Sequence, residues 1–296
     1  MSAEKDTGSG QVPSFCDWMS QLPGELHKIP LCSLAIPGSH DSMSYDLDIN
    51  SSVVEPDNLK GLSKIYLARR IVHKWAVTQE ESITKQLDAG VRYFDLRIAR
   101  KPNDPDPTRL YFYHGLYTRT DVETGLRMIH DWAEKHPKEI LILALSHFEG
   151  FQKEKRNIPT LKSCWDQGRN VIVSYDYSAN QHPEMWGRIP YYYGDSMDPA
   201  EVESKLRQSL EKGRSSEAFY VCGLNLTLPE DTRILRYIFR PCDNLTKVLQ
   251  RSLPKLLQWV KQQTSHRPNI VASDLVTRDN FVSTVVQLNI SKVEIT

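Results

Sequence analysis

The stretch at residues 82–98, SITKQLDAGVRYFDLRI, joins a segment of helical character directly to a segment of strand character. Residues 82–89 fit a helix, and the largely apolar run at 91–98 fits a strand. A helix that leads straight into a strand is the repeating unit of sheets whose strands run parallel. This stretch therefore predicts an α/β fold.

The same alternation recurs in both directions along the chain. Further candidate strands lie at 32–36, 110–113, 140–145, 170–175, 219–226 and 269–272. Further candidate helices lie at 122–135, 200–212 and 231–262, with polar starts such as Thr120 and Asp198. A chain of 296 residues without a Gly-x-Gly-x-x-Gly motif favours a closed barrel over an open dinucleotide-binding sheet. We expect a TIM-barrel-like (β/α) barrel, regular or distorted, as a single domain at 15–296 behind a disordered tail at 1–14.

Composition restricts the partners. Lys plus Arg and Asp plus Glu number 37 each, so no overall field attracts nucleic acid. No apolar run approaches the ~20 residues of a membrane-spanning helix, and the start of the chain lacks a secretory signal. The cysteines show neither a CxxC pair nor zinc spacing to histidines; they are Cys16, Cys32, Cys164, Cys222 and Cys242. These features predict reduced thiols in a cytoplasmic protein that touches membranes only peripherally.

Ionisable side chains stand at the ends of several candidate strands. His40 and Asp41 follow the first strand, Asp95 and Arg97 lie at the second, and His114 and Asp274 follow two others. In a parallel barrel the C-terminal ends of all strands open onto one face. Residues far apart in the sequence are therefore expected to converge there on one pocket.

Two histidines and an arginine at one pocket suit phosphoryl transfer. Histidine titrates near neutrality and can accept a proton from a nucleophile or donate one to a leaving oxygen. The fork of Arg97 matches two phosphate oxygens, and Asp274 or Asp41 can fix a histidine tautomer. Simpler roles remain open, namely an ion pair of Arg97 with Asp95 or Glu139 and a helix N-cap for Asp274.

Three motifs carry a family resemblance: IPGSHDS at 36–42, QLDAGVRYFDLRI at 86–98 and FYHGLY at 112–117. They resemble the X-domain of phosphatidylinositol-specific phospholipases C, and the match continues through PKEILI at 137–142 and IVASDLVT at 270–277. The small eukaryotic proteins that consist of an X-domain alone are the most similar in organisation. The resemblance implies a phosphoric diester hydrolase that yields diacylglycerol and a cyclic inositol phosphate.

The resemblance also implies a role for each matching residue. His40 deprotonates the inositol 2-hydroxyl, and His114 protonates the departing diacylglycerol oxygen. Asp274 orients His40, and Asp41 supports His114. Arg97 contacts the substrate phosphate as in bacterial members, and Asp95 braces the same strand end beside the substrate.

The chain departs from the calcium-dependent members of this family. Those enzymes follow the histidine with Asn and place an acidic residue where this chain has Arg97; Ser146 aligns with a further calcium-ligating Glu. A cation here would meet an arginine and too few carboxylates. We therefore expect calcium-independent catalysis without a metal or cofactor, acting on phosphatidylinositol or a glycosylated form at a peripheral membrane surface.

Two alternative functions also fit parts of the sequence. One is a protein with weak or absent catalysis that binds inositol lipids or a protein partner; retention of the whole acid–base set argues against it. The other is a metal-dependent glycerophosphodiester phosphodiesterase, which Arg97 disfavours. Three further features could contribute to function. His147 could line the pocket, and the basic amphipathic stretch at 62–77 could contact lipid. Trp186 and the tyrosines at 191–193 could contact lipid as well or pack in the core.

Overall fold

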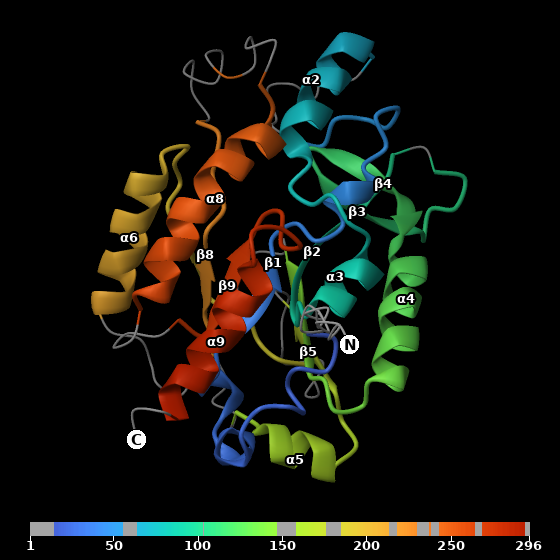
Figure 1. Cartoon of the computed structure of the whole chain (residues 1–296). Helices are drawn as coiled ribbons and strands as arrows, with labels where there is room; N and C mark the ends of the chain where they lie inside the picture. The colour runs from blue at the N-terminus through green and yellow to red at the C-terminus, as the bar shows by residue number, and fades with distance from the viewer. Residues whose placement is uncertain are drawn as a thin grey trace, which may run out of the picture.

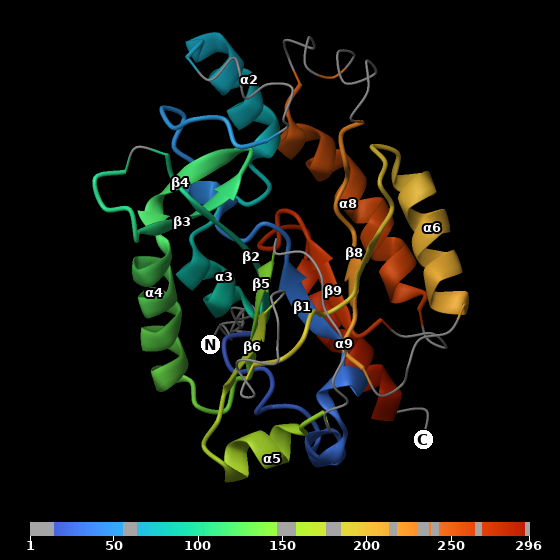
Figure 2. The same cartoon turned by 180° about the vertical axis from the view of Figure 1, so that it is seen from behind.

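The computed structural model describes residues 15–55, 64–102, 104–146, 158–175, 185–212, 218–229, 237, 243–263 and 268–293. The expected tail at 1–14 and His147 lie outside these residues. A central sheet carries α3 and α4 on one side and α6 and α8 on the other, with α9 between them (Figures 1 and 2). The fold is α/β and forms a single domain, as predicted.

Seven strands run parallel in one sheet. In spatial order they are β6 (Val171–Tyr175), β5 (Leu141–Ser146), β2 (Tyr93–Arg100), β1 (Ile36–Ser39), β9 (Ile270–Ser273), β8 (Val221–Gly223) and β7 (Tyr191–Tyr193). Within the described residues β6 and β7 do not pair with each other, and only a bridge between Ser174 and Trp186 approaches the seam. The TIM-barrel-like fold is therefore confirmed in its distorted, open form.

Two predicted strands differ from the structure. The first begins at Ile36 rather than at 32, because Leu31–Ser33 form a short 3-10 helix (η2). The candidate at 110–113 is β3 (Leu110–His114), which runs antiparallel to the end of β2 and to β4 (Leu116–Asp121). The tight turn at Gly115, whose φ of 69° suits glycine, reverses the chain between β3 and β4, where a barrel unit would need a helix.

The described α-helices are α2 (Tyr66–Ala76), α3 (Ile83–Ala89), α4 (Val122–Lys135), α5 (Leu161–Asp166), α6 (Pro199–Glu211), α8 (Leu245–Lys261) and α9 (Phe281–Val293). Five of them lie within or close to stretches that the sequence indicated, whereas α5 and α9 were not predicted. Asp121, rather than Thr120, caps α4 by accepting from the Thr124 N–H at 2.8 Å, and Asp198 caps α6 as predicted. No helix in the described part of the chain is long and apolar enough to cross a membrane.

A buried ion pair closes the end of the barrel where the strands begin. The Arg92 guanidinium meets Glu139 at 2.9 Å, and both side chains are fully buried. Glu139 also accepts from the backbone N–H groups of Met19 and Ser20, while Arg92 donates to the Cys16 carbonyl. The pair thereby fastens the segment at 15–20 beneath β2 and β5.

Loss of this pair is expected to destabilise the fold. Glu139→Ala leaves the Arg92 guanidinium buried without a counter-charge, which costs about 3–5 kcal/mol in the free energy of unfolding. Urea unfolding measures this loss, and the double variant Arg92→Leu/Glu139→Leu, which removes both charges, should recover much of it. A loss below about 1 kcal/mol for Glu139→Ala would mean that the pair behaves like an exposed one.

Candidate active site

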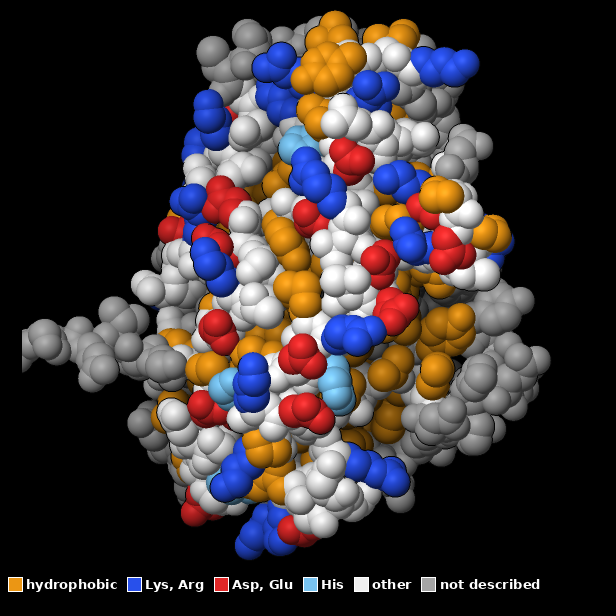
Figure 3. Space-filling view, turned by 90° about the vertical axis from the view of Figure 1, so that its right-hand side faces the viewer, with side chains coloured by type: hydrophobic (Ala, Val, Ile, Leu, Met, Phe, Trp, Pro, Cys, Tyr) orange, Lys and Arg blue, Asp and Glu red, His pale blue; other side chains and the backbone are white. Residues whose placement is uncertain are grey.

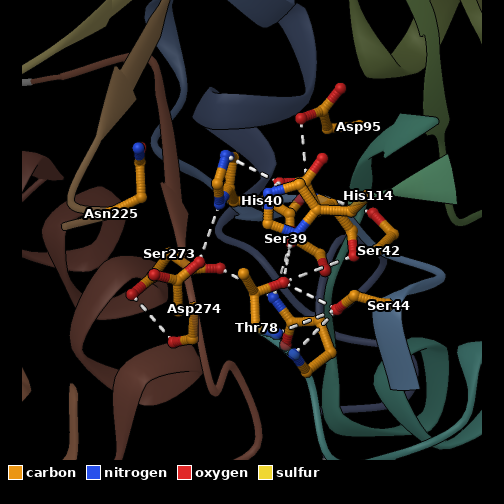
Figure 4. Close-up of polar contacts among 12 residues, drawn as sticks. Ser39, His40, Ser42, Ser44, Thr78, Asp95, His114, Asn225, Ser273 and Asp274 are labelled. Atoms are coloured by element: carbon orange, nitrogen blue, oxygen red, sulfur yellow. Dashed lines mark hydrogen bonds and ion pairs between the residues drawn. The ribbon is translucent and has the colours of Figure 1, made fainter. Parts of the chain in front are cut away.

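The register of β1 and β9 brings His40 and Asp274 together. Ser39 pairs with Ser273, so the residues that follow them leave the sheet side by side. Nδ1 of His40 lies 2.8 Å from Oδ1 of Asp274, and both side chains are buried (Figure 4). Because a carboxylate only accepts, the Nδ1 proton is fixed on His40, and its Nε2 faces Asp41 and Arg97. The alternative of a helix N-cap for Asp274 is wrong, since α9 begins only at Phe281.

Residues that follow α2 form hydrogen bonds to the backbone at the ends of β1 and β9. The Gln79 side-chain amide donates to the backbone carbonyls of His40 and Ser273, at 2.9 and 3.0 Å. The Thr78 hydroxyl lies 3.2 Å from the His40 carbonyl and 2.7 Å from the Ser44 hydroxyl (Figure 4). These three buried polar residues fix the backbone beneath the histidine, and sequence analysis did not single them out.

Asp41 occupies the centre of the site. Its φ of 44° is left-handed, a conformation that Asp tolerates better than most residues, and the turn directs its carboxylate back into the barrel. Oδ2 lies 3.1 Å from Nε2 of His40 and 3.2 Å from Nε2 of His114, and Oδ1 lies 2.8 Å from Nε of Arg97. One buried carboxylate thus joins both histidines and the arginine.

Arg97 faces this centre from the end of β2. Its Nη2 lies 3.4 Å from Nε2 of His40, and its Nε lies 3.9 Å from Oδ2 of Asp95. Burial alone would lower the pKa of Arg97, but Asp41, Asp95 and Glu55 outweigh it and hold the pKa above its usual value. Asp95 also accepts from the Asp41 N–H, so it braces the turn as well as the arginine. The expected ion pair with Asp95 is present at long range, whereas Glu139 pairs with Arg92 instead.

Glu55 is a member of the site that sequence analysis missed. Its Oε1 lies 3.5 Å from Nη1 of Arg97 and accepts from the Gly115 N–H at 3.4 Å. Its side chain is 33% exposed, which places a carboxylate on the solvent side of the guanidinium. No motif marked this position, because Glu55 belongs to an irregular loop rather than to a strand end.

His114 reaches the site from the last position of β3, next to the turn at Gly115. Its Nδ1 lies 2.6 Å from the Ala76 carbonyl at the end of α2, and this contact fixes a proton on Nδ1 because a carbonyl only accepts. Its Nε2 lies 3.2 Å from Oδ2 of Asp41, which can accept a hydrogen bond from that side of the ring. The rings of His40 and His114 stand edge to face with centroids 6.1 Å apart.

Tyr191, from β7, lies beside His40. Its ring centroid lies 6.1 Å from that of His40, and its hydroxyl donates to Oδ1 of Asn225 at 3.0 Å. Burial holds the pKa of Tyr191 well above its usual value, so this hydroxyl stays neutral. Trp186 packs against Phe219, whereas the next two tyrosines of β7, Tyr192 and Tyr193, are exposed. The aromatic run therefore divides between core, pocket and surface.

One group within the site has donor atoms close enough to share a cation. Among the described residues, His40, Asp41 and Asp95 each offer a ligand atom within 4.8 Å of the others. The Arg97 guanidinium already contacts both carboxylates, so a cation placed there would meet a fixed positive charge. This donor set is therefore poorly suited to calcium.

The carboxylates dominate the titration of His40. Burial on its own lowers the pKa of His40, but Asp41 and Asp274 outweigh it and raise the pKa to about 9. A folded-state pKa above the ordinary 6.5 means that this group stabilises the fold fully below about pH 6.5, and that the contribution is lost as pH rises through about 9.

NMR titration of the His40 ring protons checks this arrangement. The wild-type ring should titrate near pH 9, and Asp274→Asn should lower its pKa by at least about one unit because one of two neighbouring carboxylates is removed. The exposed His130 provides a matched resonance that Asp274→Asn should leave unchanged. A wild-type His40 pKa at or below about 6.5 would contradict the electrostatic account.

Comparisons with known proteins show which family the chain resembles. The family model "Phosphatidylinositol-specific phospholipase C, X domain" matches residues 63–184. The chain is 39% identical to PI-PLC X domain-containing protein 1 of Danio rerio, covering 94% of this chain and 97% of that protein. It is 37% identical to the protein of the same name from Homo sapiens, covering 92% of each chain, and 35% identical to PI-PLC X domain-containing protein 3 of Mus musculus, covering 93% and 94%.

Solved structures of bacterial enzymes share the fold. A phosphatidylinositol-specific phospholipase C from Listeria monocytogenes superposes with a TM-score of 0.60 at 20% identity, covering 93% of this chain and 99% of that one. One from Staphylococcus aureus, studied for its membrane binding, gives a TM-score of 0.62 at 18% identity, covering 93% and 98%. The chain therefore belongs to the family of PI-PLC X domain-containing proteins.

Proposed function

We propose that this protein is a phosphodiesterase that cleaves phosphatidylinositol-type lipids by intramolecular attack, using His40 and His114 as base and acid. The single observation that carries the proposal is the position of Asp41, whose Oδ2 stands 3.1 and 3.2 Å from the two Nε2 atoms. A protein that only binds lipid needs a phosphate-binding arginine but has no use for two histidines arranged in this way.

The two histidines differ in what surrounds Nε2, and this difference supports the proposal of separate roles for them. Nε2 of His40 has a donor, Nη2 of Arg97, as well as an acceptor beside it, so it can exist without a proton and accept one from the inositol 2-hydroxyl. Nε2 of His114 has the carboxylate of Asp41 beside it, which suits a proton ready for the diacylglycerol oxygen. Arg97 then balances the charge that builds on the phosphoryl oxygens.

The reaction follows from these assignments. His40 removes the 2-hydroxyl proton, the oxygen attacks phosphorus, and the bond from phosphorus to the glycerol oxygen breaks as His114 supplies its proton. The products are diacylglycerol and a cyclic inositol phosphate. Because the resting pKa of His40 is about 9, kcat/KM should rise with pH from 7 toward 9 as more of the free enzyme carries a neutral base.

We propose that no metal ion takes part. Arg97 contacts Asp41 and Asp95, the carboxylates that a cation would need, and its fork can perform the charge stabilisation that a metal performs in other phosphodiesterases. The rival reading as a metal-dependent glycerophosphodiesterase depends on the opposite arrangement, so resistance of the activity to chelators separates the two.

The tip of α2 is suited to hold the protein at a lipid surface. Ile65, Tyr66 and Leu67 are 51%, 54% and 63% exposed at the start of this helix, and Arg70 and Lys74 follow within it. Figure 3 shows apolar side chains with neighbouring Lys and Arg at the end of the molecule that carries α2. Exposed apolar side chains with cations beside them fit the interface of an anionic bilayer, so we propose peripheral contact there.

The mechanism predicts the loss caused by removing either histidine. His40→Ala or His114→Ala should lower the release of inositol phosphate from phosphatidylinositol vesicles by about a hundredfold or more, in excess chelator and with the fold intact by circular dichroism. His130→Ala, on the exposed face of α4, is the matched control and should leave the rate unchanged. No release by the wild type would favour the lipid- or protein-binding rival, and a loss below about tenfold in both variants would refute acid–base catalysis.

Glu55 should oppose the binding of substrate. A phosphodiester anion beside Arg97 would lie close to this carboxylate, so Glu55→Gln, which keeps the shape and removes the charge, should lower KM about two- to fivefold. The effect should shrink at high salt because Glu55 is partly exposed. Glu123→Gln, which removes a charge from an exposed pair on α4, is the control. An increase in KM would show that Glu55 assists binding.

A further inference from the structure

A second cluster of reactive side chains lies at the end of the barrel opposite the active site. Cys16 and Asp17 belong to the segment before the barrel, Asp88 to the last turn of α3, and His136 follows α4. Sγ of Cys16 lies 3.9 Å from each ring nitrogen of His136 and 3.8 Å from Oδ1 of Asp88, and Nδ1 of His136 lies 2.8 Å from Oδ1 of Asp17. Neither the fold nor the proposed reaction requires a thiol and an imidazole at this place.

We propose that Cys16, Asp17 and His136 bind a transition-metal ion of the zinc class, with Asp88 available as a fourth ligand. The three groups each offer an atom within 4.8 Å of the others. Bonds of about 2.0–2.3 Å in a tetrahedral site place ligand atoms roughly 3.3–3.8 Å apart, so the observed separations, which run from 2.8 Å to at most 4.8 Å, need shifts of up to about one ångström. Sulfur and imidazole ligands select zinc-like ions over magnesium and calcium.

The ligands are held by rigid neighbours. The Trp132 ring stacks on the His136 ring with centroids 4.0 Å apart and an interplanar angle of 17°, and the Trp132 indole N–H donates to Oδ1 of Asp88 at 2.8 Å. The backbone of Cys16 is held by the buried Arg92. Supporting contacts of this kind fix ligand orientation and reduce the cost of assembling a metal site.

The charges around Cys16 also favour a cation. The Asp88 carboxylate lies beside the Cys16 thiol and the Asp17 carboxylate beside the His136 ring, and the negative charges of both attract a cation. Asp17 and Asp88 are exposed, which leaves a path for an ion from solvent. Binding transfers the thiol proton to water and replaces it with the ion, while neutral His136 contributes a ring-nitrogen lone pair.

The ion would join the segment at 15–20 to α3 and α4, far from the strand ends that carry His40 and Asp274. It would thus stabilise the fold and leave the chemistry to the other site. Its role is independent of the phosphodiesterase proposal, so either can fail without the other.

Cobalt(II) titration of the tag-free, reduced full chain tests the site, followed by competition with zinc. We expect one equivalent to bind with the near-ultraviolet absorption of a thiolate–cobalt bond, zinc to displace it, and zinc to raise Tm by on the order of 5 °C at about 100-fold over Kd. Cys16→Ser and His136→Ala should each remove the absorption and the rise in Tm, and Asp17→Asn should weaken binding about tenfold or more.

Two matched controls locate the ion. Cys164→Ser removes another thiol, and His40→Ala removes a donor of the active-site group, so both should bind as the wild type does. Absence of thiolate absorption in the wild type would overturn the proposal. The same conclusion would follow if absorption persisted in Cys16→Ser or disappeared in His40→Ala or Cys164→Ser.

Discussion

The site depends on the parallel register that β1 keeps with its two neighbours. Ser39 pairs with Ser273 of β9 on one side and with Phe94 of β2 on the other. His40 and Asp274 therefore leave the sheet together, and Asp95 comes directly after the residue that faces Ser39. A shift of one residue in either pairing would turn these side chains to opposite faces and dismantle the site. Backbone hydrogen bonds thus set distances that the side chains alone could not enforce.

Burial of several charges around one carboxylate gives the site its chemistry. Asp41 contacts both histidines and Arg97, and water reaches almost none of it. Such a network costs desolvation energy, which its mutual contacts must offset. The opposite end of the barrel contains another buried pair, Arg92 with Glu139, which takes no part in the site. Fold stability at one end can therefore support a strained, highly charged arrangement at the other.

The site residues at the strand ends were predictable from the sequence. In a parallel barrel the C-terminal ends of the strands share one face, so a strand pattern followed by a polar residue is enough to place that residue there. That reasoning placed His40, Asp41, Asp95, Arg97 and Asp274 at one mouth, and the structure brings them together there. It placed His114 there for a partly wrong reason, because β3 runs antiparallel and the residue arrives on a turn. Alternation of apolar runs does not report strand direction, which depends on how the connecting loops turn the chain.

Residues on loops could not be found in this way. Glu55, Thr78 and Gln79 reach the site from segments with no strand or helix period, and their contacts depend on tertiary packing. The same limit hid the pairing of Cys16 with His136, because no spacing rule joins residues so far apart in the chain. Conversely, the aromatic run at 191–193 was conspicuous in sequence, yet Tyr191 lies beside His40 while Tyr192 and Tyr193 are exposed, a division that the run itself does not reveal.

Helix α2 runs from the surface of the molecule to His114. Its first residues form the exposed apolar tip, and its last residue, Ala76, offers a carbonyl that has no partner within the helix and accepts from Nδ1 of His114. The His114 ring is thereby held against the C-terminal end of α2. Since Thr78 and Gln79 follow directly and hold the His40 backbone, a displacement of α2 at a lipid surface would act on both histidines through a few hydrogen bonds.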